Sequence, residues 1–311
     1  MYRGLTVGVA IPAYRAEATI GQVVATLPAL VDRVVVVDDA SPDGTGAALA
    51  AVTDARLEVI KHERNRGVGG AMKTAFRRAL ELGVDVVVKM DSDGQMDPGR
   101  LPALLDALVD TGCDYAKGNR FLDEHALRDM PRVRLLGNLA LTFLTKMASG
   151  YWHVFDPQNG YVACRATMLK RLDLDAVADD YFFENDMLVH LNILEGRVVD
   201  VPMPARYGDE RSSMRLGTVL RRFPMRLVDR LRKRIWQRYV LRDFSPVALF
   251  LFVGAPLFLA GTVFGAWAWY ESAKTGVVSS TGRVMLSVLP IVIGFQLMLQ
   301  AVLLDISSSP R

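Results

Sequence analysis

Short apolar runs alternate with helical patterns through the first 120 residues of the chain. The apolar runs are rich in β-branched residues, which is typical of buried strands. They cover Leu5–Ile11, Arg33–Val37, Leu57–Lys61, Val84–Met90 and Asp114–Lys117. Helical patterns lie between them at Thr19–Leu30, Thr45–Val52, Gly70–Leu82 and Leu101–Thr111. This alternation predicts an α/β fold with a parallel sheet and right-handed crossover connections.

Two longer apolar segments lie near the end of the sequence. Val247–Tyr270 contains 24 residues without a charge, and Val284–Leu304 contains another 21. At about 1.5 Å per helical residue, each spans roughly 30 Å or more, the thickness of a bilayer's hydrocarbon core. These lengths favour two transmembrane helices over two buried helices of a soluble core. We therefore expect an α/β domain at 1–214, basic amphipathic helices at 215–243 and a membrane hairpin at 244–311.

Charge is distributed unevenly along the chain. Residues 215–242 carry ten basic side chains against one acid, Asp229, whereas residues 1–214 carry 24 basic and 30 acidic ones. A basic tract beside a hydrophobic span favours anionic lipid over nucleic acid and marks the cytoplasmic side of a membrane. The N-terminal apolar run is too short for a signal peptide. We expect a multi-pass membrane protein whose main domain and both termini are cytoplasmic. Cys113 and Cys164 predict neither a metal site nor a disulfide framework.

Polar residues follow the predicted strands, where the ligand crevice of an open α/β sheet lies. The fourth run leads into Asp91-Ser92-Asp93-Gly94-Gln95, whose oxygens suit a hard cation such as Mg²⁺ or Mn²⁺. The second leads into Asp38 and Asp39, which suit ribose hydroxyls or base N–H groups. Glycines at 67, 69 and 70 open a helix and would let backbone N–H groups approach a diphosphate. Each feature alone is typical of an ordinary turn, but together they indicate a nucleotide site.

The motifs IPAY, VVVDDASPDGT, NRGVGGA and DSDGQMDP occur in this order. In this order and spacing they resemble the inverting family-2 glycosyltransferases of the GT-A fold. GNRF at 118–121, YFFENDM at 181–187 and YGDERSS at 207–213, with the C-terminal hairpin, are similar to the polyprenyl-phosphate branch. That branch includes dolichol-phosphate mannose synthase and bacterial undecaprenyl-phosphate glycosyltransferases. The resemblance covers nearly the whole chain.

The resemblance implies roles for individual residues. It places the nucleotide against Pro12, Tyr14, Asp38, Asp39, Asp91 and Ser92. It assigns Asp91, Asp93 and Gln95 to the metal and Arg120 to the reacting phosphates. Phosphate binding also falls to Arg206 or Arg211. Their segment departs from the family's usual Arg-x-Tyr-Gly pattern, and Arg15 and Ala16 stand where the family often has a Glu.

Two helical segments add candidate residues. Glu184 and Asp186 begin a helix that is expected to run to about Leu194. They are interpreted as groups that bind sugar hydroxyls or accept a proton, although acids in a first helical turn also complement the helix dipole. Arg132 and Arg134 open an apolar helix that would flank a lipid.

The implied reaction moves one sugar from a UDP- or GDP-hexose onto an undecaprenyl- or dolichyl-type phosphate, for cell-envelope glycan or glycoprotein assembly. One alternative is a processive polysaccharide synthase, which normally carries Gln-x-x-Arg-Trp and more membrane helices. The other is a non-catalytic nucleotide-sugar-binding membrane protein, against which the intact Asp91, Asp93 and Gln95 argue. The resemblance also implies a homo-oligomer, a tetramer. Gly261-x-x-x-Gly265 would allow close helix packing within the hairpin or between subunits.

Overall fold

The computed structural model describes residues 1–120, 132–204 and 216–310; the side chains of 132–138 and 216–222 lie outside the description. The chain forms two compact units. The first comprises Met1–Leu231 with the last two residues, and the second comprises Arg232–Ser309.

The first unit is built on a seven-stranded sheet with the order β3-β2-β1-β4-β6-β5-β7. The strands are β1 (Val7–Ala13), β2 (Arg33–Asp38), β3 (Leu57–Lys61), β4 (Val86–Lys89), β5 (Tyr115–Asn119), β6 (Val162–Arg165) and β7 (Val198–Pro202). β1 pairs in parallel with β2 on one side and β4 on the other. The strand order reverses there, which is where open α/β sheets bind their ligands.

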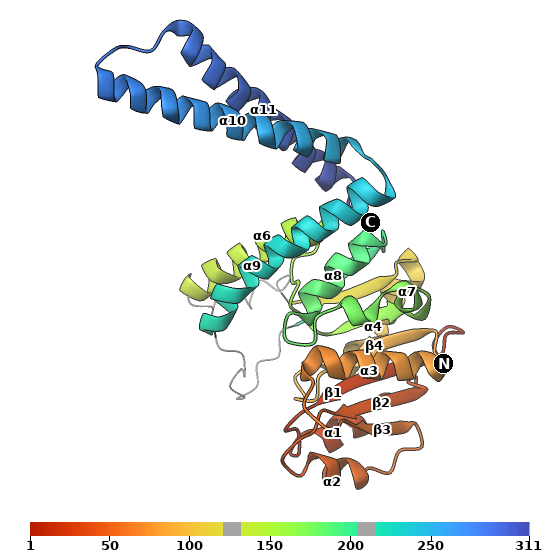
Figure 1. Ribbon diagram of the computed structural model, residues 1–311. Coiled ribbons are helices and arrows are strands. Elements are labelled where there is room, and N and C mark those ends of the chain that lie inside the picture. The colour runs from red at the N-terminus through yellow and green to blue at the C-terminus, as the bar shows by residue number, and fades with distance from the viewer. Residues whose placement is uncertain (121–131, 205–215, 311) are drawn as a thin grey trace. The chain divides into compact units, whose positions relative to one another are not determined.

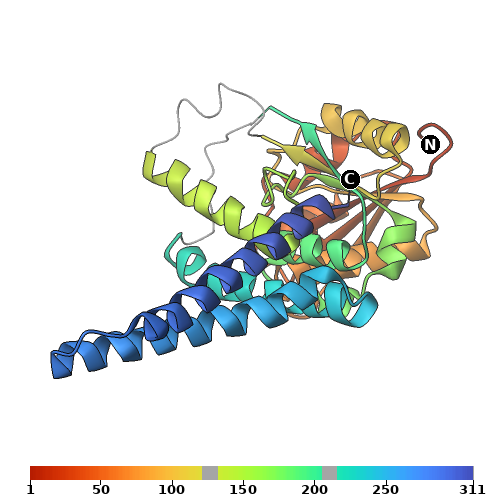
Figure 2. The same cartoon turned by 90° about the horizontal axis from the view of Figure 1, so that it is seen from above.

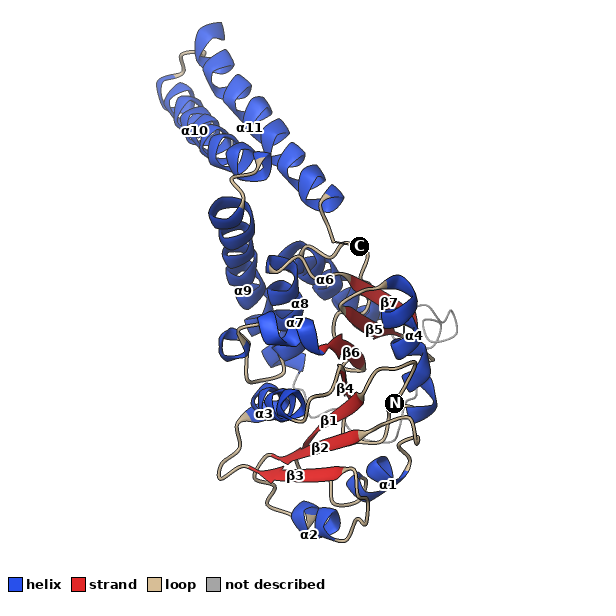
Figure 3. Cartoon of the chain, turned by 90° about the vertical axis from the view of Figure 1, so that its right-hand side faces the viewer, coloured by secondary structure: helices blue, strands red, loops and turns tan. Residues whose placement is uncertain are grey.

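Helices cover both faces of this sheet (Figure 3). They are α1 (Ile20–Ala25), α2 (Thr45–Ala50), α3 (Gly67–Glu81), α4 (Leu101–Thr111), α7 (Ala166–Arg171) and α8 (Phe183–Ile193), with 3₁₀ turns η1 (Pro98–Arg100) and η2 (Leu174–Ala176). The remaining helices of this unit, α6 (Arg132–Ser149) and the first part of α9 (Leu216–Arg234), share a separate hydrophobic cluster. α1, α2 and α4 contribute to one hydrophobic core, and α3, α7 and α8 contribute to the other. Because successive strand residues point to opposite faces, Val86 and Val88 enter the first core and Val87 the second.

The predicted α/β fold is confirmed, but the sheet is mixed rather than parallel throughout. All five predicted strands and the four helices between them are present, with ends shifted by up to five residues. β6 and β7 were not predicted. β6 runs antiparallel to both of its neighbours, β4 and β5. Its sequence, Val-Ala-Cys-Arg, contains one β-branched residue, so it lacks the run of such residues that identifies β2 and β4.

The second unit contains two candidate membrane spans. It holds the last residues of α9, the π-helix η3 (Ile235–Arg242), α10 (Pro246–Thr275) and α11 (Thr281–Ser307). α10 and α11 lie side by side as a hairpin (Figures 1 and 2) and enclose the predicted spans. Both are long and apolar enough to cross a membrane.

Small residues bring the two hairpin helices together. A Cβ atom on Gly261 would lie 2.9 Å from the backbone nitrogen of Ile291, and one on Gly254 would lie 2.9 Å from the carbonyl oxygen of Gly294. Such separations are shorter than real contacts allow, so larger residues would push the helices apart. Of the two roles expected for the Gly261 motif, the structure shows packing within the hairpin.

In the first unit, the basic tract turns two arginines toward protein acids. Arg226 lies 2.7 Å from the carboxylate of Asp180, and Arg230 lies 2.6 Å from that of Asp186. The two arginines are four residues apart and therefore share one face of α9. These contacts correct the expectation that the tract as a whole serves anionic lipid.

In the second unit, the same four-residue spacing continues with Arg234 and Arg238. Arg234 is buried and forms two hydrogen bonds with Asp305, of 2.6 and 3.0 Å, while Tyr239 donates to the same carboxylate. Arg238 donates to the carbonyl oxygen of Ser308 at 2.7 Å. The end of α11 is thereby fixed to η3, and these two arginines are also held by protein partners.

Candidate active site

An open cleft lies at the carboxyl ends of β4 and β5 in the described part of the chain. It is lined by Asp91, Asp93, Gln95, Met96, Asp97, Arg100, Arg120, Gln158, Asn159, Gly160, Tyr161, Met203 and Pro204. The cleft therefore brings together four residues that the sequence singles out: Asp91, Asp93, Gln95 and Arg120.

A buried lysine lies beneath the first of these residues. Lys89 ends β4, and its ammonium group lies 2.5 Å from the Asp91 carboxylate and 3.3 Å from that of Glu184. Burial alone would lower the pKa of Lys89, but these two carboxylates outweigh it and raise the pKa above its usual value. Lys89 is thus a fixed cation that joins the strand end to the start of α8. It also places the predicted residue Glu184 close to Asp91.

The turn after β4 presents the predicted metal ligands. Gly94 has a φ of +75°, a conformation that side chains rarely adopt, and the backbone N–H of Gln95 donates to Asp93 at 3.0 Å. On the outer side of the turn, the Thr19 hydroxyl donates to the carbonyl oxygen of Ser92 at 2.6 Å. Asp91, Asp93 and Gln95 are consequently held together at the cleft.

These three residues fit a divalent cation that is shared with a phosphorylated ligand. Among the described residues, no group of three or more His, Cys, Asp or Glu side chains forms a complete metal cage. Mg²⁺ is usually held by one or two carboxylates together with water and substrate phosphates. Two carboxylates and one amide oxygen match that kind of incomplete site.

Arg120 is oriented by a buried carboxylate from the segment before β6. Its Nε and Nη2 atoms donate to Asp156 at 2.8 and 3.1 Å, and its backbone N–H donates at 3.2 Å. The Asp156 side chain is only 2% exposed, whereas that of Arg120 is 42% exposed. The buried acid therefore fixes the direction of a guanidinium group at the cleft surface.

The predicted nucleotide residues of β1 and β2 lie outside the described cleft lining. Pro12 is opposite Val37 in the β1–β2 register, and Tyr14 follows β1 with 45% of its surface exposed. Asp38 is buried and accepts from the backbone N–H of Ser41 at 2.9 Å. These residues occupy the carboxyl ends of β1 and β2, and β1 is the neighbour of β4.

Asp39 is bound by the turn that precedes α3. Its carboxylate lies 2.7 Å from Nδ1 of His62 and accepts from the backbone N–H groups of Arg66 and Gly67 at 2.9 and 2.8 Å. Both of its oxygens therefore have protein partners in this structure. The nucleotide contact assigned to Asp39 stays a prediction.

The glycine-rich turn corrects one expectation. The N–H groups of Gly69 and Gly70 donate to the carbonyl oxygen of Asp179, at 2.7 and 3.1 Å. A Cβ atom on Gly67 would lie 2.5 Å from the same oxygen. The glycines allow the 178–179 backbone to pack against the start of α3, and these N–H groups are occupied rather than directed at a diphosphate.

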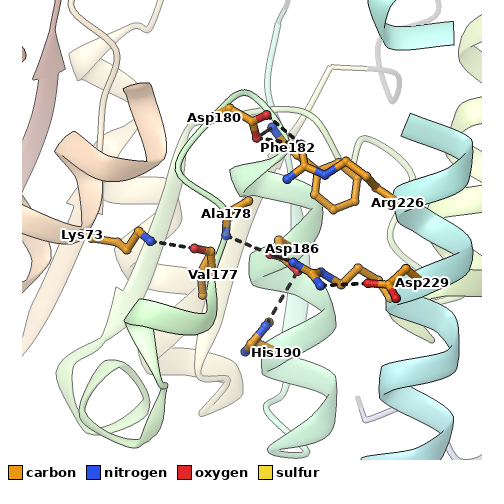
Figure 4. A network of polar contacts seen from close by, with 10 residues as sticks. Lys73, Val177, Ala178, Asp180, Phe182, Asp186, His190, Arg226 and Asp229 are labelled. Carbon is orange, nitrogen blue, oxygen red and sulfur yellow. Dashed lines mark hydrogen bonds and ion pairs between the residues drawn. The ribbon is translucent and has the colours of Figure 1, made fainter. Parts of the chain in front are cut away.

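Asp186 belongs to a network between α8 and α9 (Figure 4). It is fully buried and receives two hydrogen bonds from Arg230, of 2.6 and 3.0 Å, and one from the backbone N–H of Ala178. His190 Nε2 lies 3.8 Å from the same carboxylate. Asp186 does not line the described cleft, in contrast to Asp91 and Asp93. Its catalytic role stays a prediction.

The remaining predicted arginines cannot be placed. Arg206 and Arg211 lie outside the described residues, and the side chains of Arg132 and Arg134 also lie outside the description. Sequence reasoning in turn missed Lys89, Lys117 and Asp156. The signal for the lysines was present, because each is a charged residue inside a strand that is otherwise fully buried. Asp156 carries no such signal, since nothing in its sequence neighbourhood indicates a partner.

Comparison with known proteins identifies the class of enzyme. The chain belongs to glycosyl transferase family 2, whose model matches residues 8–173. It is 31% identical over 223 residues to the UDP-N-acetylglucosamine–dolichyl-phosphate N-acetylglucosaminyltransferase of Methanococcus voltae, covering 67% of this chain and 88% of that one. It is 38% identical over 173 residues to the undecaprenyl-phosphate mannosyltransferase of Micrococcus luteus, covering 55% and 70%. The predicted glycosyltransferase class and the resemblance to the polyprenyl-phosphate branch are confirmed.

Solved structures support the fold. Glucosyl-3-phosphoglycerate synthase from Mycobacterium tuberculosis, in complex with UDP, has a TM-score of 0.57 at 24% identity and covers 74% of this chain and 80% of its own. A second structure of that enzyme contains Mn²⁺, UDP and glucosyl-3-phosphoglycerate, with a TM-score of 0.55 at 22% identity. At this level of identity the similarity establishes the GT-A fold alone.

Proposed function

We propose that this protein transfers one sugar from a UDP- or GDP-linked donor to a polyprenyl phosphate at the cytoplasmic face of a membrane. The observation that carries the proposal is a cleft in which Asp91, Asp93 and Gln95 lie with Arg120, in a chain that ends in two long apolar helices. The relatives named for transfer to dolichyl and undecaprenyl phosphate favour the same acceptor class.

The donor would bind across the carboxyl ends of β1, β2 and β4. In this proposal Pro12, Tyr14, Asp38, Asp39 and Ser92 form the nucleoside side, while Asp91, Asp93 and Gln95 hold Mg²⁺ or Mn²⁺ together with the diphosphate. When bound, the metal neutralises the charge that develops on the departing diphosphate. Lys89 holds Asp91 in place for this task, because its ammonium group lies 2.5 Å from that carboxylate.

The proposed chemistry is a single displacement. An oxygen of the acceptor phosphate attacks the anomeric carbon, the bond from that carbon to the diphosphate breaks, and the nucleoside diphosphate leaves with the electron pair. One displacement inverts the anomeric configuration. A phosphate monoester has a second pKa near about 6, so it is already mostly dianionic at neutral pH.

An acceptor of this kind needs alignment more than deprotonation. Arginine suits phosphate oxygens because its planar fork of N–H groups matches them. Arg120 lines the cleft, and Asp156 fixes its orientation at 2.8 Å. Glu184 and Asp186 both lie outside the described cleft lining. Glu184 lies near Asp91 through Lys89 and is the better-placed candidate for sugar hydroxyls, whereas Asp186 is held by Arg230.

The membrane part would anchor the protein at the bilayer that contains the lipid phosphate. Trp236 and Phe244 have exposed side chains shortly before α10 begins at Pro246. Aromatic residues at such positions favour the headgroup region of a bilayer. The second unit therefore supplies an interfacial anchor next to its apolar spans.

Product analysis tests the proposal. The full chain in lipid nanodiscs would receive Mn²⁺, radiolabelled UDP- or GDP-hexoses and undecaprenyl phosphate, with undecaprenol as the control that lacks the phosphate. A labelled lipid monosaccharide that forms only with the phosphorylated acceptor is the expected result. Arg120→Ala should lower its yield by about 10²-fold or more, the usual scale for losing an electrostatic contact of this type.

A matched arginine variant serves as the control. Arg33→Ala changes an exposed arginine at the amino end of β2, away from the strand ends that form the cleft, and should leave the yield unchanged. A polymeric product, or transfer to undecaprenol as efficient as transfer to its phosphate, would contradict the proposal.

A further inference from the structure

Two buried lysines share one row of the sheet beneath the cleft. Lys89 of β4 and Lys117 of β5 are both opposite Val162 of the intervening strand β6. Residues in register on adjacent strands point to the same face, so both lysines lie on the face covered by α3, α7 and α8. Their exposed fractions are 2% and 1%.

Both ammonium groups reach the same segment of chain. Lys117 donates a hydrogen bond to the carbonyl oxygen of Asn159. The next residue, Gly160, lies against Lys89 so closely that any side chain there would collide with the ammonium group. Asn159 and Gly160 both line the cleft. One ammonium group therefore binds a residue of the cleft wall, and the other lies against the next residue.

We propose that Lys117, acting together with Lys89, is a positioning residue for sugar transfer: it holds residues 156–160 in the conformation that binds the nucleoside diphosphate beside Asp91. The inference rests on the proposed function for its role in turnover. The proposed role of Lys117 in nucleotide binding requires only that the protein is a nucleotide-dependent glycosyltransferase.

The cost of burying Lys117 supports this role. A buried ammonium group loses hydration, and a methionine of similar length would fill the same space without that loss. Burial lowers the pKa of Lys117 to about 8, against the opposing influence of Asp156, Glu184 and Asp200; the nearby Arg120 lowers it further. Asp156 faces Lys117 from the segment before β6, Glu184 from α8, Asp200 from β7 and Arg120 from the end of β5. Because packing does not require a charge at this position, the ammonium group of Lys117 indicates a role at the cleft.

The segment that Lys117 supports also carries Asp156. The backbone N–H of Asn159 donates to the carbonyl oxygen of Asp156 at 3.2 Å, so one short turn joins the two. Asp156 in turn orients Arg120. Loss of the lysine contact should therefore disturb both the Asn159–Gly160 wall and the direction of the Arg120 guanidinium.

Lys73 provides a matched control. It is also buried, at 6% exposure, and donates to a backbone carbonyl, that of Val177, at 2.7 Å. The segment that it holds does not contribute to the described cleft lining. Lys73 also pairs with Asp179 at 2.6 Å, so Lys73→Met removes a buried ammonium group and its contacts from a segment outside the described cleft lining.

The first measurement is nucleotide binding by the full chain in detergent, using UDP and GDP as probes with Mn²⁺ and without acceptor. For whichever probe binds the wild type, Lys117→Met should raise Kd by about tenfold or more, as expected when a hydrogen bond from a charged group is lost. Lys117→Arg should recover part of the affinity. The Kd of Lys73→Met should stay within about twofold of the wild-type Kd.

A pH series supplies a readout that a purely structural role would not affect. Lys117 is charged below its pKa of about 8 and neutral above it, so wild-type affinity should fall between pH 7 and pH 9. Lys73→Met should show the same fall, whereas Lys117→Met should be weaker at pH 7 and nearly independent of pH. Melting curves confirm that each variant is folded.

Two results would overturn the inference: equal Kd values for folded Lys117→Met and the wild type, or an identical pH dependence in both. A wild type that binds nucleotide but transfers nothing to undecaprenyl phosphate would instead contradict the proposed function. The Kd values of the wild type and Lys117→Met would still test the role of Lys117 in nucleotide binding. The two failures are therefore distinguishable.

Discussion

Replacing Asp186 by asparagine tests whether this residue is a catalytic base or a structural clamp, meaning that it ties α8 to α9 through Arg230. Asp186 is fully buried, and its carboxylate forms two hydrogen bonds with Arg230 and one with the N–H of Ala178. Asparagine keeps the shape and the acceptor for Ala178 but removes the charge. Arg230, whose side chain is 20% exposed, would then be left without its carboxylate partner at α8.

The expected loss of stability follows from burial. Breaking a buried ion pair from one side costs about 3–5 kcal/mol, and the partial exposure of Arg230 should reduce this to about 2–3 kcal/mol. For a unit of this size that corresponds to a fall in Tm of roughly 5–10 °C. Asp180→Asn is the matched control, because Asp180 pairs with Arg226 on the same face of α9 but is 59% exposed. It should cost no more than about 1 kcal/mol.

Thermal unfolding and a pH–rate profile, measured on the same preparations, decide between the two roles. A clamp predicts a lower Tm for Asp186→Asn, recovery of part of the loss when Arg230→Met is added, and residual activity with an unchanged pH profile. A wild-type Tm in Asp186→Asn, combined with near-complete inactivation and loss of an ionisation limb, would refute the clamp and make Asp186 the base.

The other predictions concern the metal, the hairpin and the buried lysine. Asp93→Ala or EDTA should abolish turnover and metal-dependent nucleotide binding while Tm stays unchanged; full activity in either would contradict the metal site. A chain ending at Arg242 should still bind nucleotide but glycosylate a long-chain lipid phosphate poorly, which a comparison of embedded and short-chain acceptors measures. The pKa of Lys117 is lowered from 10.5 to about 8, so the unfolded chain binds more protons between these values and wild-type stability rises with pH there. The difference in free energy of unfolding between the wild type and Lys117→Met, measured by denaturant titration, should therefore change by about 2 kcal/mol between pH 7 and 9.5, whereas a constant difference would count against a buried charge.

Local patterns in the sequence predicted much of the fold. The apolar runs identified β1 to β5, and the residues at the carboxyl ends of strands identified Asp91, Asp93 and Gln95 as one group. These features depend on short-range chemistry, because a buried strand needs apolar residues and its end meets the ligand crevice. The two hairpin helices were equally clear, since each contains more than 20 consecutive residues without a charge.

Long-range pairing was not predictable in the same way. β6 is a four-residue strand whose position depends on β4 and β5, and Asp156 acquires its role only when the fold places it beside Arg120. The arginines at 226 and 230 belong to a tract whose composition was interpreted as favouring anionic lipid, but their partners Asp180 and Asp186 lie more than 40 residues earlier in the chain. The glycines at 69 and 70 suggested a phosphate loop, whereas the carbonyl oxygen of Asp179 occupies their N–H groups.

Mass spectrometry of the lipid product, at increasing ratios of donor to undecaprenyl phosphate, tests the central claim most directly. Transfer of one sugar to the lipid phosphate predicts a single product that carries one sugar however large the excess of donor, because the phosphate oxygen is consumed in the reaction. A ladder of products that lengthens with donor excess, or donor turnover without any glycosylated lipid phosphate, would contradict it.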